Sequence, residues 1–131
     1  MESLSTRVED WLRQEIVDFG EQQREGPSEA LRRVVHEWWA MSRFPAIEFR
    51  DGVMGRRAGL RAGPDVWEVV MVWKDYEPDR DAFHRHFGGY VTPDGLDQAL
   101  DYCASFAEEI EDRLDQNRRM AARLESGRAD G

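Results

Sequence analysis

Two helix signals separated by paired glycines constrain this chain more than any other feature. Gly88-Gly89 ends one segment, because glycine accepts the left-handed backbone conformation that closes a helix. Thr92-Pro93 then starts another, with threonine in the capping position and proline in the first helical position, where its missing N–H is not needed. The pattern predicts two helices joined by a tight turn, which is the arrangement of a helix-turn-helix.

Apolar residues at helical spacing predict three earlier helices, over residues 4–24, 28–44 and 66–76. Ser28 is the expected cap of the second. The second helix has an apolar surface that includes the adjacent Trp38 and Trp39, which we expect to be core residues or a subunit contact. After Thr92, a single apolar stripe from Leu96 to Leu114 predicts one long last helix.

A β-hairpin is expected between the second and third helices. Residues 46–50 alternate apolar and polar side chains, as a half-buried strand does. Asp51-Gly52 favours a tight turn, and residues 53–60 can return as the second strand. Such a short hairpin is marginal alone, so we expect it to dock on the helices. Asp65 is the expected cap of the helix that follows.

The composition favours a single soluble domain. The chain has 131 residues, a formal net charge of −9 and one cysteine, Cys103, which excludes an internal disulfide. The longest apolar run, Val69–Trp73, is far shorter than a membrane-spanning helix, and the first residues show no basic-then-apolar signal pattern. We therefore expect a cytoplasmic protein without membrane contact. The acidic balance disfavours non-specific binding to nucleic acid, although a local basic face can coexist with it.

Together these signals predict a mostly α, α+β chain: a winged-helix-like helix-turn-helix domain with a short β-hairpin. The expected boundaries are a helical extension over residues 1–45, the hairpin and helix-turn-helix over residues 46–115, and a helical tail over residues 116–131.

Five short motifs carry a resemblance to a known family: Gly55-Arg56-Arg57-Ala58, Val66–Val70, Thr92-Pro93-Asp94, Ala99–Tyr102 and Ala107–Ile110. With them, residues 53–114 resemble a small bacterial helix-turn-helix family, long of unknown function, that includes VapB-like antitoxins of toxin–antitoxin pairs. The resemblance covers about half of the chain and leaves out the first 45 residues. It implies a DNA-binding type of fold, frequent dimerisation and a partner toxin with a PIN-type ribonuclease fold.

Arginines of the hairpin are the first DNA-binding candidates. Arg50, Arg56, Arg57 and Arg61 lie close together in the sequence, with Asp51 as the only acid nearby. A β-ribbon that carries arginines can contact phosphates or enter a groove. The alternatives are an arginine-bearing edge strand that discourages aggregation, or pairing with carboxylates across an interface.

The helix after Thr92 is the formal recognition helix, and its Gln98 is a further DNA-binding candidate. Its expected outward positions also include Asp94, Asp97, Asp101 and Tyr102. Three carboxylates facing phosphates would be repelled, so a solvated or protein-binding face is the alternative.

Partner binding is predicted for the tail, through a weak heptad-like seam of Ile110, Leu114, Ala121 and Leu124. The seam suits a second copy, the N-terminal helix or a toxin; the alternative is a frayed, solvated end. His84 and His86 do not face together on a helix, and no second ligand cluster completes a metal site. Cys103 lies on an apolar stripe and is expected in the core.

No nucleophile–base pair or carboxylate pair stands out, so the sequence predicts neither an enzyme nor a cofactor. The leading hypothesis is a DNA-binding transcriptional regulator, an antitoxin that binds operator DNA as a homodimer and masks a toxin ribonuclease. The alternative is a helical protein-interaction module that does not bind DNA.

Overall fold

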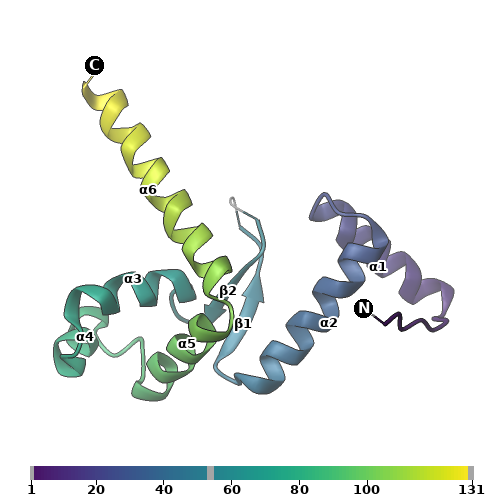
Figure 1. The fold of residues 1–131 in the computed structure, drawn as a ribbon, viewed down its shortest axis with the longest axis horizontal. Coiled ribbons are helices and arrows are strands. Elements are labelled where there is room, and N and C mark those ends of the chain that lie inside the picture. Colours follow the sequence, from purple (N-terminus) through teal and green to yellow (C-terminus); the bar gives the residue numbers. More distant parts are fainter. Residues whose placement is uncertain (1, 53–54, 130–131) are drawn as a thin grey trace.

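The computed structural model describes residues 2–52 and 55–129. In chain order its elements are α1 (Asp10–Gln22), α2 (Pro27–Arg43), β1 (Ile47–Arg50), β2 (Arg57–Leu60), α3 (Val66–Tyr76), α4 (Arg80–Phe87), α5 (Pro93–Ser105) and α6 (Ala107–Ala129). The predicted mostly α, α+β class is confirmed. Figure 1 shows the hairpin in the middle, with α1 and α2 on one side, α3, α4 and α5 on the other, and α6 projecting away.

The first two helices pack across each other (Figure 1), but both begin at different residues than predicted. α1 begins at Asp10 rather than at residue 4, and Leu4 is fully exposed, so it has no apolar surface to pack on. α2 begins at Pro27, with the extended Gly26 before it and no side-chain cap, so Ser28 lies inside the helix. Proline at the first helical position sets the start here, since its fixed φ suits a helix and its missing N–H is not needed.

The hairpin pairs β1 with β2 in antiparallel register, from Ile47 opposite Leu60 to Arg50 opposite Arg57. The return strand therefore begins at Arg57, later than predicted. The predicted turn at Asp51-Gly52 leads into the predicted strand start at Val53, which lies with Met54 outside the described residues. The backbone N–H of Gly55 donates to the carbonyl of Gly52, at 2.9 Å.

Helix α3 spans the predicted residues 66–76, and the predicted signals at the end of α4 and at the start of α5 are confirmed. Asp79 caps α4 by accepting a hydrogen bond from the N–H of Ala82, at 3.0 Å. Gly88 closes α4 with a left-handed φ of 59°. The hydroxyl of Thr92 accepts from the N–H of Gly95, at 3.0 Å, so the predicted threonine cap of α5 is confirmed.

The long last helix is the clearest error of the sequence prediction. It breaks at Phe106, whose φ of −130° and ψ of 47° are not helical, and α5 and α6 leave this residue in different directions. The Phe106 ring packs against His36 and Trp39 of α2 and against Tyr102, with ring centroids 4.8 to 6.1 Å apart. Aromatic packing between distant segments thus accompanies the break, and no glycine or proline marks it.

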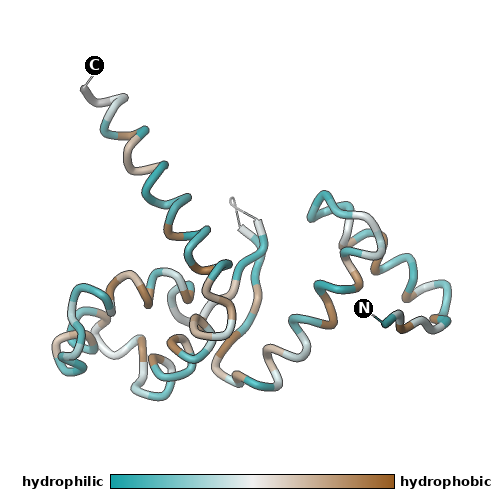
Figure 2. Tube along the Cα trace, in the orientation of Figure 1, coloured by the Kyte–Doolittle hydropathy of each residue, from teal (hydrophilic) through white to brown (hydrophobic). Residues whose placement is uncertain are grey.

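A single core joins the hairpin to the α3–α6 body. Its largest fully buried side chains are Tyr102, Phe83, Ile47, Leu96, Ile110, Val66, Val69 and Val91. In Figure 2 the projecting part of α6 is mostly hydrophilic, and much of the hydrophobic colour lies in the body at its base. The core therefore ends where α6 leaves the body.

Candidate functional site

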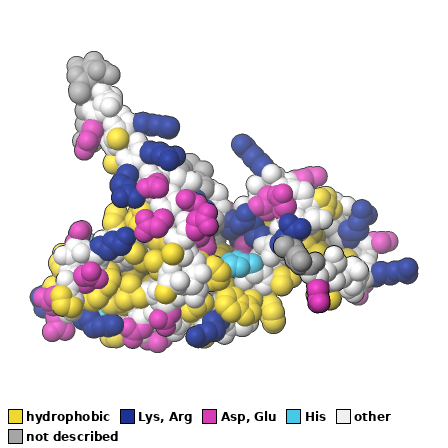
Figure 3. Space-filling view, viewed as in Figure 1, with side chains coloured by type: hydrophobic (Ala, Val, Ile, Leu, Met, Phe, Trp, Pro, Cys, Tyr) yellow, Lys and Arg dark blue, Asp and Glu magenta, His cyan; other side chains and the backbone are white. Residues whose placement is uncertain are grey.

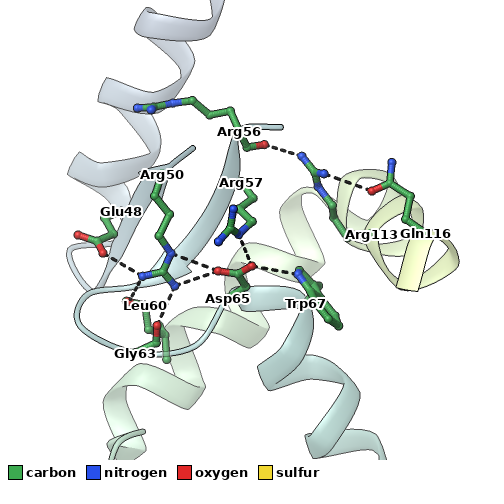
Figure 4. A network of polar contacts seen from close by, with 10 residues as sticks. All are labelled: Glu48, Arg50, Arg56, Arg57, Leu60, Gly63, Asp65, Trp67, Arg113 and Gln116. Carbon is green, nitrogen blue, oxygen red and sulfur yellow. Dashed lines mark hydrogen bonds and ion pairs between the residues drawn. The ribbon is translucent and has the colours of Figure 1, made fainter. Parts of the chain in front are cut away.

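The buried carboxylate of Asp65 is the centre of a polar cluster at the base of the hairpin (Figure 4). One oxygen accepts from Nε and Nη2 of Arg50, at 3.2 and 3.0 Å. The other accepts from Nε of Arg57 and from the indole N–H of Trp67, the latter at 3.1 Å. Asp65 occupies the cap position of α3 but makes no side-chain cap bond, because its oxygens are used by these donors.

Arg50 lies across the hairpin rather than out toward solvent. Its guanidinium also donates to the carbonyl of Gly63, at 2.7 Å, and to Glu48, at 3.1 Å. An added Cβ on Gly59 would collide with the Arg50 guanidinium. The missing side chain of Gly59 therefore makes room for an arginine of the same chain.

Arg56 joins the hairpin to the two N-terminal helices. Its Nε and Nη2 donate to the carboxylate of Glu37, at 2.7 to 3.0 Å, and its guanidinium lies 5.2 Å from the centre of the Phe19 ring. Only 7% of the Glu37 side chain and 20% of the Arg56 side chain are exposed. The hydrogen bonds to Glu37 raise the pKa of Arg56 above its usual value, so the guanidinium stays charged.

Arg61 is the most exposed of the four predicted DNA-binding arginines, with 55% of its side chain accessible. It donates to the carbonyl of Pro45, at 2.9 Å, and approaches Glu48 at 4.0 Å. The prediction that Asp51 is the only nearby acid is therefore wrong. The fold brings Glu37, Glu48 and Asp65 to the same arginines, two of them from outside the hairpin segment.

The predicted recognition helix, α5, presents fewer side chains than expected. Tyr102 is fully buried rather than outward, and its hydroxyl donates to Glu109, at 2.7 Å. Burial, and then Glu109, raise the pKa of Tyr102. The side-chain oxygen of Gln98 accepts from the N–H of Ala46, and its NH₂ donates to Asp94, both at 2.7 Å. Gln98 thus links α5 to the start of the hairpin.

The two histidines of α4 point to different partners. Nδ1 of His84 donates to the carbonyl of Val91, at 3.0 Å, while His86 contacts the Tyr76 hydroxyl, at 3.2 Å. Within residues 2–52 and 55–129, no three His, Cys, Asp or Glu side chains are placed to hold a metal ion. Cys103 packs against the core as predicted, and burial raises the pKa of its thiol, which disfavours the reactive thiolate.

The predicted partner-binding seam divides into two halves. Ile110 and Leu114 are buried in the core of the chain itself, with 2% and 7% exposure, so they are not surface anchors. Ala121 is exposed, and Leu124 is 64% exposed on the part of α6 that leaves the body. The seam was predicted as a unit because sequence spacing alone does not show where a helix leaves its core.

Trp38 and Trp39, predicted as core residues or a subunit contact, are exposed on the outer face of α2. Its large apolar side chains are 42% to 63% exposed; they are Leu31, Val34, Val35, Trp38 and Trp39. The inward positions include the buried Ala30, Glu37 and Ala40. Figure 3 shows hydrophobic side chains at the surface near the end of α2 that meets the hairpin. An exposed apolar stripe on a helix whose inner face is small or polar is unusual for a surface that meets only water.

A cavity of about 280 Å³ lies where α6 leaves the body. Its lining residues are Arg57, Asp65, Trp67, Glu68, Arg113, Gln116, Asn117 and Met120. The lining combines two arginines with two carboxylates, and Arg57 is already paired with Asp65. Burial raises the pKa of Glu68. This arrangement has no excess of either charge that would favour an ionic ligand.

None of the described helices is both long enough and apolar enough to cross a bilayer. Comparison with protein-family models, with curated proteins and with solved structures gives no match to this chain.

Proposed function

We propose that this chain is a protein-interaction module that binds another polypeptide through the outer face of α2. The observation that carries the proposal is the inverted arrangement of that helix, with its apolar stripe outward and polar or small side chains inward. Apolar helix faces dock against other helices or into hydrophobic grooves. Exposed aromatic side chains such as Trp38 are also typical anchors of protein interfaces.

The ion pairs of the hairpin arginines favour this proposal over DNA binding by the hairpin. Freeing Arg56 for a phosphate would leave the buried carboxylate of Glu37 without its partner. Breaking a buried ion pair by removing one member costs about 3–5 kcal/mol of stability. A single contact with a phosphate contributes less than this to binding at physiological salt. Arg50 and Arg57 are held by Asp65 in the same way. The DNA-binding regulator therefore stays a prediction from sequence and resemblance.

The masking of a toxin is one form of the proposed activity. The projecting end of α6 offers a second apolar surface, with Met120 and Leu124 exposed by 45% and 64%. An antitoxin role is compatible with either surface. Its toxin partner rests on the resemblance of residues 53–114 and not on the geometry of α2.

Site-specific photo-crosslinking tests the proposal. A photoreactive amino acid replaces Val35, which is 53% exposed, in the full chain produced in its own cells. The matched control carries the same group at the exposed Asp101 of α5. We expect a protein adduct of discrete mass from position 35 and none from position 101. The absence of any adduct at position 35 would reject the α2 face as a docking surface.

A DNA-binding measurement separates the two function classes. Fluorescence anisotropy with labelled duplex DNA from upstream of the gene, at low salt, should give no saturable binding. Saturable binding that is lost on Arg61→Ala would instead support the regulator and overturn this proposal, since Arg61 is the most exposed of the four arginines.

A further inference from the structure

We infer that the partner on the outer face of α2 is an amphipathic helix of another protein, with acidic side chains along one border of its apolar face. The inference rests on the proposed function and adds the chemistry of the partner. Four apolar side chains of α2 recur at the i, i+3, i+4 and i+7 spacing of a helical stripe, each at least 42% exposed: Leu31, Val34, Val35 and Trp38. The ridge that such a stripe forms packs into the groove of a second helix.

Two arginines border this stripe on one side. Arg32 precedes Val35 by three positions and Arg43 follows Trp39 by four, so each lies beside an exposed apolar side chain. Both arginines are exposed, and neither forms an ion pair with any residue that the structure describes. The Arg43 guanidinium lies 5.2 Å from the centre of the Phe44 ring, which leaves its charge uncompensated.

The other charged side chains of α2 do not neutralise this border. Arg33 and Glu37 are already paired, with Glu25 and Arg56 respectively. Glu29 is in the first turn, on the far side of the helix from the stripe. The border is therefore positive in a chain whose net charge is −9, and carboxylates on the partner would complement it.

A second copy of this chain does not offer such a surface. Within the described part of the chain, only α2 and α6 carry more than one exposed large apolar side chain, and on α6 these are Met120 and Leu124. Residues 118–128 around them include four arginines and a single acid, Glu125. Both exposed apolar surfaces are thus bordered by arginines, and neither supplies the carboxylates that α2 lacks.

A single-stranded nucleic acid is the other class of polymer that binds surfaces of tryptophan and arginine. Most of the stripe is aliphatic, however, and leucine and valine offer no ring on which a base can stack. A polyanion that continued past the two arginines would also meet the repulsion of a chain with a net charge of −9. A helix with a few carboxylates avoids this repulsion, so the observations favour the helix.

Fluorescence anisotropy with two labelled helical peptides tests the inference. Arg32 and Arg43 are eleven positions apart, or about 16 Å along the helix. Both peptides therefore carry the same leucine stripe, and two border positions eleven residues apart are glutamate in one peptide and lysine in the other. The purified full chain should bind the glutamate peptide at least about tenfold more tightly, because it gains two ion pairs where the lysine peptide meets two like charges.

Charge reversal on the chain provides the control. The double variant Arg32→Glu, Arg43→Glu should prefer the lysine peptide. The matched double variant Arg119→Glu, Arg123→Glu reverses two exposed arginines of α6 and should keep the preference for glutamate. Far-ultraviolet circular dichroism checks that both variants keep the fold.

Equal binding of the two peptides, binding of neither, or an unchanged preference after Arg32→Glu, Arg43→Glu would overturn the inference. Tighter binding of labelled oligothymidylate, lost in the same variant, would assign the surface to nucleic acid instead. Mass spectrometry of the adduct from position 35 separates this inference from the proposed function. A crosslinked segment without acidic residues, or one from a second copy, overturns the acidic helix alone, whereas the absence of any adduct rejects both.

Discussion

At the scale of single residues, a few buried carboxylates determine how the arginines are used. Asp65 is 5% exposed and accepts hydrogen bonds from three side chains, two of which are arginines. Glu37 is equally buried and holds Arg56. Because a buried ion must be paired to be tolerated, these arginines have a structural role that their position in a basic, glycine-rich sequence does not suggest.

Replacing Asp65 by asparagine should destabilise the chain by about 3 kcal/mol, because Arg50 and Arg57 lose their anionic partner inside the fold. Urea denaturation measures the change. Asp97→Asn is the control: its bridge to Arg80 is also short, at 2.7 Å, but about half of each side chain is exposed. An exposed pair contributes up to about 1 kcal/mol. Equal losses in the two variants would show that burial of Asp65 has no special effect.

At the scale of elements, the pairing of α1 with α2 depends on a close approach at Gly20. A Cβ atom added there would lie 2.7 Å from the backbone oxygen of Glu25 and 3.1 Å from Cβ of Ala30. The first of these neighbours is backbone and cannot rotate away. This approach lets α1 cross α2 on the side away from the apolar stripe, which leaves that stripe open.

Gly20→Ala should therefore destabilise the helix pair by about 1–3 kcal/mol. The free-energy cost of the steric overlap exceeds the gain of about 1 kcal/mol that alanine brings inside a helix. Thermal unfolding followed by circular dichroism measures the effect. Gly127→Ala in α6 is the control, because nothing lies within 4 Å of its added Cβ. We expect that variant to be neutral or slightly stabilised. A neutral Gly20→Ala would contradict the tight packing described here.

At the scale of the whole molecule, α6 divides into a packed part and a projecting part. Leu114 is 7% exposed, whereas residues 118–127 are all exposed. Ending the chain after Arg118 should change the free energy of unfolding by less than about 1 kcal/mol, because residues 119–127, which it removes, are all exposed. Leu114→Ala should cost about 2–5 kcal/mol. Denaturant unfolding of both variants measures this; a large loss on truncation would mean that the projecting part is packed.

The sequence predicts features that depend on neighbouring residues, but not those that depend on contacts between distant segments. The cap at Thr92 and the glycine at the end of α4 act through residues a few positions apart. They were therefore readable from the sequence alone. The break at Phe106 was not, because its ring packs on α2, about seventy positions earlier in the chain.

The candidate site follows the same division. The sequence by itself determined helix α3, the end of α4, the start of α5 and the presence of a hairpin and of a cluster of arginines, because these depend on local spacing and residue type. Only the tertiary structure decided that Glu37 and Asp65 pair with Arg50, Arg56 and Arg57 and that the apolar stripe of α2 faces outward. Burial and ion pairing are properties of distance in space, and residues far apart in sequence meet only after the chain has folded.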